Sequence, residues 1–447
     1  MSTSARALAD VVDRSDPATS RRAVLSLAVL TLLFVVNYVD RQLLAILIEP
    51  IKRELGASDT AMGFLSGLAF ALFYTTAGIP IARVADRGSR RRVIVWGVVV
   101  WSAMTACCGL ARNFAQLAAA RFGVGIGEAA LAPSAHSLIA DGFPLHRRAT
   151  ALGIFNVGGN VGVMLGFIAG GWIGETLGWR TAFLVVGLPG LAAALLARFT
   201  LDEPPRGATE PVHADRAAPA AERAAAPEPR FREVVSFLLA RRTFVHVSLA
   251  SAFYVFAAYG FTVWGSSFLI RVHGLSLRET GLWMGLIQGI GGGLGTFLGG
   301  VLADRGADRD PRVLVWIPAL GGLLALPLLC VFLFAPTPMA ALLGYAPAMV
   351  VVLFFTGPSF AVVQSLAPPR LRAQAAALLL FTMNLIGLGI APLVVGLLND
   401  VLAERFGILA VRYSLLVTSV GALVAVFHSL RAGRTIASDL AAARAAG

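Results

Sequence analysis

The chain is a succession of uniformly apolar runs, each about 20 residues long, separated by short polar segments. A run of this length spans the roughly 30 Å hydrocarbon core of a bilayer as an α-helix. With 57% hydrophobic and only 14% charged residues, and a mean hydropathy of +0.77, the chain has more apolar surface than one soluble core can bury. The sequence therefore predicts an all-α integral membrane protein.

We expect twelve transmembrane helices in two groups of six. The twelve spans are placed at 23–48, 60–82, 93–111, 114–140, 149–173, 181–199, 243–270, 279–302, 313–335, 338–364, 373–398 and 410–430. This gives an N-terminal tail, a first six-helix half, a linker, a second six-helix half and a C-terminal tail, at 1–22, 23–199, 200–242, 243–430 and 431–447.

The linker changes character along its length. Its stretch 201–230 is rich in Pro, Ala and alternating charge, which predicts a disordered segment. The following FREVVSFLLARR alternates apolar and basic positions, as in a short amphipathic helix on a membrane surface.

The basic residues are distributed unevenly among the loops. Of the 37 Lys and Arg, 27 lie on the side of the termini and linker and only 8 on the opposite side. The positive-inside rule then places both termini and the linker in the cytoplasm. Compact loops favour a bacterial inner membrane. The net charge of +12 follows from this topology, so it does not indicate nucleic-acid binding.

Four charged residues remain well inside the spans: Asp40, Arg41, Arg121 and Glu128. Arg121 and Glu128 are seven residues apart, on one helix face and separated by about 10 Å of rise. A charge in hydrocarbon costs on the order of 2.5–3.5 kcal/mol on insertion scales, so these groups must meet water or pair with one another. By helix rise, Asp40, Arg41 and Arg121 lie in the outer half of the bilayer and Glu128 nearer its middle. We predict a salt-bridge network along a water-filled cavity.

These charges suggest a proton-coupling hypothesis. Glu128 would carry the proton, because burial raises the pKa of a carboxyl group and a nearby arginine lowers it again. Arg121 would modulate Glu128 and contact an anionic substrate, with Asp40 and Arg41 relaying or latching the network. The alternative is a static ion-pair cluster that only fixes helix packing.

A sequence repeat links the two halves. ARVADRGS at 82–89 is echoed by GVLADRGA at 300–307, each after the second span of its half. Repeats of one orientation predict a pseudo-two-fold axis along the membrane normal. The first copy, continued by Arg90 and Arg91, resembles the G-x-x-x-D-R-x-G-R-R loop of the major facilitator superfamily, although Ala82 replaces its first glycine.

The span-four pattern L-x-x-x-R-x-x-x-G-x-G of that family also matches, as Leu117, Arg121, Gly125 and Gly127. The resemblance implies the twelve-helix fold in two pseudo-symmetric six-helix halves. It also implies a cytoplasmic gate that closes the outward-facing state, formed by Asp86, Arg87, Arg90, Arg91, Asp304 and Arg305. Plain topology anchoring is the alternative for the arginines.

Within the superfamily, NYVDR at 37–41 together with GIGEA at 125–129 resembles the Spinster branch, whose members include lysolipid and sphingoid-phosphate exporters. The anion:cation symporters for hexuronates and other organic acids share much of both strings. In span five, Val163 stands where drug/proton antiporters have a proline, which disfavours that class.

Uncharged polar residues near mid-span are further candidates for the substrate site, with ordinary interhelical hydrogen bonding as the alternative. They are Asn37, Asn156, Asn160, Gln288, Thr356 and Asn384. The second half has no intramembrane charge and many Phe and Leu residues. A cavity charged on one wall and apolar on the other suits an amphiphile with an anionic head. The sequence thus predicts a proton-coupled transporter of a lysolipid or sphingoid-phosphate type of substrate, and a sugar acid:proton symporter is the alternative.

Other function classes find little support. The six histidines are scattered without metal-ligand spacing, no G-x-x-x-x-G-K loop is present, and the three cysteines lie in apolar runs. We therefore expect no enzyme, no metal and no cofactor. A passive channel or a receptor is a further alternative function. The expected partners are a small-molecule or lipid substrate, protons and membrane lipids, with the protein acting as a monomer.

Overall fold

The computed structural model describes residues 21–206, 231–368 and 371–445, and these are predominantly helical. The first half contains α2 (Arg21–Ile46), the short α3 (Ile48–Leu55), the continuous α4–η1–α5 (Asp59–Phe64, Leu65–Ala69, Phe70–Arg87), α6 (Arg90–Gly109), α7 (Phe114–Glu128), α8 (Leu131–Gly142), α9 (Leu145–Thr176) and α10 (Trp179–Thr200).

The second half follows a short helix α12 (Phe231–Leu239). It contains α13 (Arg242–His273), α14 (Leu277–Ala307), α15 (Val313–Phe334), α16–η3–α17 (Pro338–Val352, Leu353–Phe355, Thr356–Leu366), α18–η5–α19 (Arg372–Thr382, Met383–Ile390, Ala391–Phe406), the 3-10 turn η6 (Gly407–Leu409) and α20 (Ala410–Ala445).

Within the described residues, ten helical segments are long and apolar enough to cross a membrane. One of them, Arg372–Ala443, is 72 residues long and contains the two spans that end in α19 and α20. A further span is divided into α7 and α8, each too short to count by itself. Together these segments make up the twelve spans, six before residue 207 and six after residue 230.

The break in the fourth span lies directly after Glu128. Pro133 explains it, because proline has no N–H to donate to the carbonyl of Ala129 and its ring crowds that carbonyl. Two turn residues, Ala129 and Ala130, separate α7 from α8. Glu128 is therefore the last residue of α7, beside a local irregularity of the backbone.

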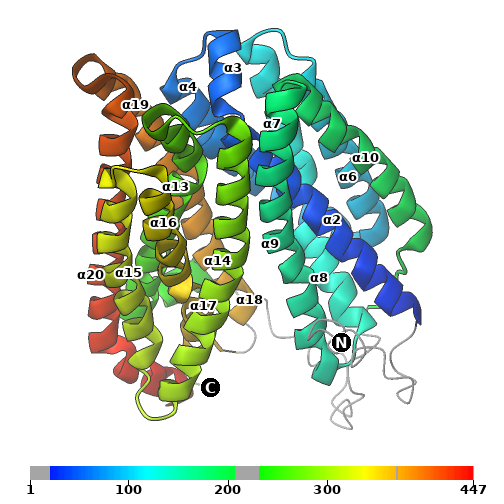
Figure 1. Cartoon of the computed structure of the whole chain (residues 1–447). Helices are drawn as coiled ribbons and strands as arrows, with labels where there is room; N and C mark the ends of the chain where they lie inside the picture. The colour runs from blue at the N-terminus through cyan, green and yellow to red at the C-terminus, as the bar shows by residue number, and fades with distance from the viewer. Residues whose placement is uncertain (1–20, 207–230, 369–370, 446–447) are drawn as a thin grey trace, which may run out of the picture.

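The described chain begins and ends at the same end of the helix bundle, at the lower side of Figure 1. We call this the terminal end and the opposite one the far end. The two halves meet closely toward the far end, where α4 packs on α19 and α9 packs on α14. A Cβ atom at Gly171 of α9 would lie only 2.6 Å from the carbonyl oxygen of Leu277, and one at Gly63 of α4 only 2.3 Å from that of Pro392. Glycine is needed for this close approach of helix backbones.

Besides the fourth span, which was expected as one helix over 114–140, two segments differ from the sequence expectations. The first residues of the linker, 201–206, are held on the first half: Leu201 is buried, and the Asp202 amide donates to Ser26 Oγ at 2.9 Å. The expected disorder of 207–230 lies outside the described residues.

The last helix is also longer than expected. It continues past residue 430 to Ala445, because Ala432, Ile436 and Leu440 recur every four residues and form a buried stripe. Asp439 accepts a hydrogen bond from the Thr243 amide at 2.9 Å and so fixes this extension to the start of α13.

Candidate functional site

The four intramembrane charges form two crossed ion pairs between the first and fourth spans. Arg41 of α2 donates to Glu128 Oε2 of α7, with Nη2 at 2.6 Å and Nε at 3.2 Å. Arg121 of α7 donates to Asp40 Oδ1 of α2 at 3.1 Å. Asp40 also accepts a hydrogen bond from the Thr105 hydroxyl of α6. The structure therefore pairs Glu128 with Arg41, whereas the sequence suggested that Arg121 would act on it.

Burial distinguishes the members of this network. Asp40, Arg121 and Glu128 are 1%, 3% and 1% exposed, whereas the Arg41 side chain keeps 12% of its surface. The expectation that Arg121 and Glu128 themselves line a water-filled cavity does not describe this conformation. Their charges are balanced by partners instead, and Arg41 is the member that solvent or a ligand reaches.

Aromatic rings surround the Arg41 guanidinium. Its central carbon lies 4.8 Å from the ring centre of Phe70, 5.0 Å from that of Tyr38 and 5.5 Å from that of Tyr74. Cation–π attraction operates within about 6 Å. Phe70 and Tyr74 are on α5, so the arginine is bound by groups from spans one, two and four. It can leave Glu128 without losing all of its stabilising contacts.

Glu128 is only half satisfied. Its Oε2 binds Arg41, but its Oε1 is buried and has no hydrogen-bond partner in the part of the chain that the structure describes. The Asn37 Nδ2 and Arg121 Nε atoms are likewise buried without partners there. An unpaired buried carboxylate oxygen is costly, and a proton on it would remove the charge. Among the described residues, Glu128 Oε1 is therefore an unsatisfied acceptor inside the site.

The other polar candidates are spread over both halves. Asn37 is 3% exposed and lies one turn before Arg41. Asn160 of α9 reaches the second half, where its Oδ1 would lie 3.4 Å from a Cβ at Gly292. Gln288 of α14 accepts a hydrogen bond from Thr262 at 2.7 Å.

The three remaining candidates are outside the charged network. Thr356 donates to the Leu353 carbonyl within its own span at 3.1 Å, Asn156 is exposed, and Asn384 is half-buried in η5. The structure does not gather all six candidates into one cluster.

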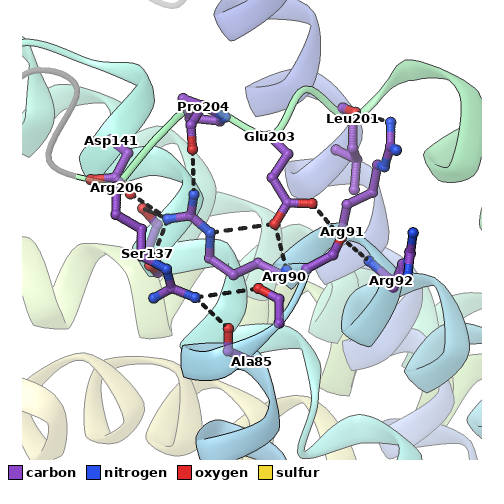
Figure 2. Close-up of polar contacts among 12 residues, drawn as sticks. Ala85, Arg90, Arg91, Arg92, Ser137, Asp141, Leu201, Glu203, Pro204 and Arg206 are labelled. Atoms are coloured by element: carbon purple, nitrogen blue, oxygen red, sulfur yellow. Dashed lines mark hydrogen bonds and ion pairs between the residues drawn. The ribbon is translucent and has the colours of Figure 1, made fainter.

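Two arginines of the expected cytoplasmic gate, Arg90 and Arg91, form a network within the first half (Figure 2). Arg90 is 2% exposed and pairs with Asp141 of α8; its Nη2 donates to the Pro204 carbonyl at 2.6 Å. The Arg90 amide donates to Glu203 at 2.6 Å, and Arg91 reaches the Leu201 carbonyl at 3.4 Å. In this conformation, Arg90 and Arg91 fasten the chain that leaves the sixth span.

The other expected gate residues, Asp86, Arg87, Asp304 and Arg305, are exposed at the terminal end. No side-chain hydrogen bond or ion pair joins them to each other or to another described residue. The two halves are thus not joined through this motif in the present conformation.

The far end carries an ion-pair cluster that the sequence reasoning missed. Arg271 of α13 donates to both carboxylate oxygens of Asp59, at 2.5 and 2.9 Å, and to Glu49 at 2.9 Å. Lys52 also pairs with Asp59 at 2.5 Å. Because Arg271 belongs to the second half and its acidic partners to the first, the cluster joins the halves.

Two acidic residues near the far end cap helices of the opposite half. Asp400, on α19, accepts hydrogen bonds from the Asp59 and Thr60 amides at the start of α4, at 3.1 and 2.8 Å, and from the Thr60 hydroxyl at 2.6 Å. Glu175, at the end of α9, accepts from the Arg278 amide at the start of α14 at 2.7 Å. Spans five and eleven correspond under the pseudo-two-fold repeat, as do spans two and eight. The two caps are therefore symmetry-related contacts between the halves.

Comparison with known proteins agrees with this architecture. The family model of the Major Facilitator Superfamily matches residues 30–392. An MFS-type efflux pump of Mycolicibacterium smegmatis is 35% identical over 91% of this chain and 91% of its own length. The D-galactonate transporter of Escherichia coli O6:H1 is 28% identical over 90% of this chain and 94% of its own length.

A solved structure is similar in both fold and sequence. It is the crystal structure of a bacterial homologue of the human lysosomal transporter Spinster, in an inward-facing and unoccupied conformation. It matches with a TM-score of 0.84 and 31% identity, covering 94% of this chain and 99% of that one. These similarities are to transporters and not to enzymes. The chain belongs to the Major Facilitator Superfamily, as a Spinster-like, multi-pass membrane transporter.

Proposed function

We propose that this protein is a proton-coupled secondary transporter that moves an anionic amphiphile by alternating access. The observation that carries the proposal is the state of Glu128. It is a buried carboxylate with one oxygen on a partly exposed arginine and the other without a partner.

The coupling follows from competition for Arg41. An anionic headgroup that enters the site meets Arg41 first, because the Arg41 side chain is 12% exposed and that of Glu128 is fully buried. When the headgroup binds the guanidinium, Glu128 loses its compensating charge. Breaking a buried ion pair in this way costs about 3–5 kcal/mol if the remaining charge stays unpaired. Protonation of Glu128 removes this cost, so anion binding and proton uptake occur together.

Asp40 and Arg121 take a different part in this scheme. Asp40 accepts hydrogen bonds from both Arg121 and the Thr105 hydroxyl, so in this scheme it keeps its partners while Glu128 exchanges Arg41 for a proton. Arg121 is 3% exposed, and it supports the positive potential of the site without touching the headgroup in this conformation. The static ion-pair alternative predicts no proton uptake on ligand binding.

The amphiphile class rests on the surroundings of Arg41, where charged and aromatic side chains of the first half lie together. The charges belong to the first half, and the aromatic groups around Arg41 can accommodate an apolar tail next to a charged head. The similarity to the Spinster homologue favours a lysolipid or sphingoid-phosphate type of substrate. The similarity to a D-galactonate transporter supports the second candidate, a sugar acid moved together with a proton.

We further propose that both termini are cytoplasmic, in a bacterial inner membrane, so that this conformation opens toward the cytoplasm. The excess of Lys and Arg in the loops at the terminal end supports the cytoplasmic assignment. The far-end contacts through Arg271, Asp400 and Glu175 support an opening at the terminal end, where Asp86 and Asp304 are exposed. In the outward-facing state, the repeated motif that contains Asp86 and Asp304 would close the terminal end, and the far-end contacts would separate.

A ligand-induced proton-uptake measurement tests the function. The purified protein, in weakly buffered detergent solution with a pH indicator, is mixed with a lysophospholipid or with a sugar acid. We expect the lysophospholipid to cause proton uptake by the unaltered protein and by the control Glu404→Gln, which changes an exposed acid, but not by Glu128→Gln. If only the sugar acid causes proton uptake, the substrate is the second candidate, a sugar acid, and not an amphiphile. Saturable binding with no proton uptake for either ligand would refute the coupling.

A further inference from the structure

The first half carries a groove on its membrane-facing side that the transport scheme does not use. Its volume is about 540 Å³, and it runs between α5 and α6 down to the break between α7 and α8. Its apolar lining includes Ile81, Val84, Trp96, Val100, Ile126 and Ala130.

The groove is a surface feature that the bilayer reaches. Trp96 is 67% exposed, Val84 61% and Val100 37%, all on membrane-spanning helices. In a membrane protein, exposed apolar side chains of this kind meet lipid chains. From Ser89 to Val100, α6 rises about 16 Å, roughly half of the 30 Å hydrocarbon core. The groove therefore matches the depth of a single leaflet, the one at the terminal end.

The end of the groove nearest the bundle's terminal end is polar and positively charged. Ser89 and Arg92 line it there, at the first turn of α6. Arg92 is exposed, and its guanidinium has no partner in the described part of the chain; its amide donates to Ser89 Oγ at 3.2 Å. Figure 2 shows Arg92 beside the Arg90 network.

Glu203, which lies beside this end, binds Ser89 and Arg90 and makes no ion pair with Arg92. Glu203 accepts from the Ser89 hydroxyl and from the Arg90 amide, and it faces the Arg90 guanidinium at 3.7 Å. Arg206 adds a second cation close by, with its Nη2 on the Ala85 carbonyl at 2.6 Å. A cluster of arginines at the membrane surface attracts anionic headgroups.

We infer that the groove binds an anionic phospholipid of the leaflet at the terminal end, with one acyl chain between α5 and α6 and the phosphate at Arg92. The inference rests on the groove's depth, its apolar walls and its single charged end. It does not depend on the transported substrate or on proton coupling. The bound chain would lie against Ile126, Gly127 and Ala130, directly behind the backbone that carries Glu128.

Photo-crosslinking in nanodiscs tests the site. The whole protein is reconstituted in phosphatidylethanolamine with a small fraction of phosphatidylglycerol that carries a diazirine on one acyl chain, and labelled peptides are mapped. We expect labelling of 80–100, with a severalfold decrease in Val100→Trp and in Val84→Trp, which fill the groove from two helices. Val420→Trp is the matched control, because Val420 is 52% exposed on α20 and lies outside the groove, and it should not change the labelling.

The headgroup is tested with a charge-removing variant. Arg92→Gln should lower labelling by phosphatidylglycerol about fivefold, the factor expected for one arginine near an anionic surface. Arg309→Gln, an exposed arginine of the second half, should leave it unchanged. The inference is overturned if a phosphatidylethanolamine probe labels the groove as strongly as phosphatidylglycerol does. It is equally overturned if neither groove-filling variant reduces the labelling.

Discussion

The inter-half cap made by Asp400 leads to the most quantitative prediction. Asp400→Ala removes three hydrogen bonds that this side chain accepts from the Asp59 and Thr60 groups of the opposite half. The N-cap of α4 is Ser58, and Asp400 adds acceptors for the next two amides. Losing such acceptors at a helix start costs about as much as losing an N-cap, about 0.5–2 kcal/mol, and losing a negative charge there about 0.3–1 kcal/mol more. We take about 2 kcal/mol as the total.

This cost falls on one conformation only, because the contact exists only while the far end is closed. A difference of about 2 kcal/mol changes the ratio of closed to open molecules about 30-fold. If the far-end-open state is populated at about 1% in the unaltered protein, it rises to about a quarter in the variant. Glu175→Ala should shift the ratio in the same direction by less, since Glu175 accepts a single amide hydrogen bond.

Double electron–electron resonance measures these populations. Spin labels at Arg112 and Ile408, exposed on opposite halves near the far end, replace the native side chains in a background without the three cysteines. We expect a second, longer distance in Asp400→Ala, and a still larger share of it when Glu175→Ala is added.

Glu404→Ala is the matched control, because it removes an exposed acid of the same helix, four residues further along. It should leave the distances unchanged. The reasoning fails if Asp400→Ala gives the same distance distribution as this control, or if the variant shortens the mean distance.

Three further predictions concern the charged network and the closed interface. Arg41→Lys keeps the charge but loses the two-nitrogen contact to Glu128, so substrate affinity in a binding titration should fall at least tenfold. An unchanged affinity would mean that Arg41 does not bind the headgroup. Thr105→Val leaves Asp40 with Arg121 as its hydrogen-bond partner, so the free energy of unfolding should fall by about 1–3 kcal/mol, measured as a lower thermal unfolding temperature in detergent. No decrease would mean that the hydroxyl contact is dispensable. Gly171→Val adds a side chain at a position where a Cβ alone would lie 2.6 Å from a backbone carbonyl oxygen of α14, so the far-end spin labels should move apart. Unchanged distances in a folded variant would contradict the close packing of α9 on α14.

Much of the fold could be predicted because lipid permits few backbone arrangements. Apolar runs of about 20 residues must be helices, and a chain with Arg41 and Arg121 inside such runs must supply partners for them. The same argument singled out Asp40 and Glu128. The prediction that these four groups interact agrees with the structure.

The pairing itself could not be predicted from helix rise alone. Helix rise gives the depth of each charge, and the seven-residue spacing places Arg121 and Glu128 on one face. The partner of each charge depends on how α2 and α7 are rotated and on the reach of each side chain. Arg41 is long enough to cross to Glu128 and leaves Asp40 to Arg121. The helix break after Glu128 was not predicted either, because the fourth span was expected as one helix over 114–140; Pro133 was the signal that could have found the break.

The far-end contacts were missed for another reason. Glu175 and Asp400 stand near span ends, where acidic residues ordinarily face water, and their role depends on which helix start of the other half lies opposite. The repeat of the two halves was the signal that could have found them, because it pairs span five with span eleven and span two with span eight.

The most direct test of the proposed mechanism is gradient-driven accumulation of a lysophospholipid in proteoliposomes that contain Glu128→Gln. The amide keeps the size of the side chain but cannot gain or lose the proton. We predict that the variant still exchanges substrate across the membrane at equal pH and no longer accumulates it when a pH gradient is imposed. Accumulation that responds to the pH gradient as in the unaltered protein would contradict the role assigned to Glu128.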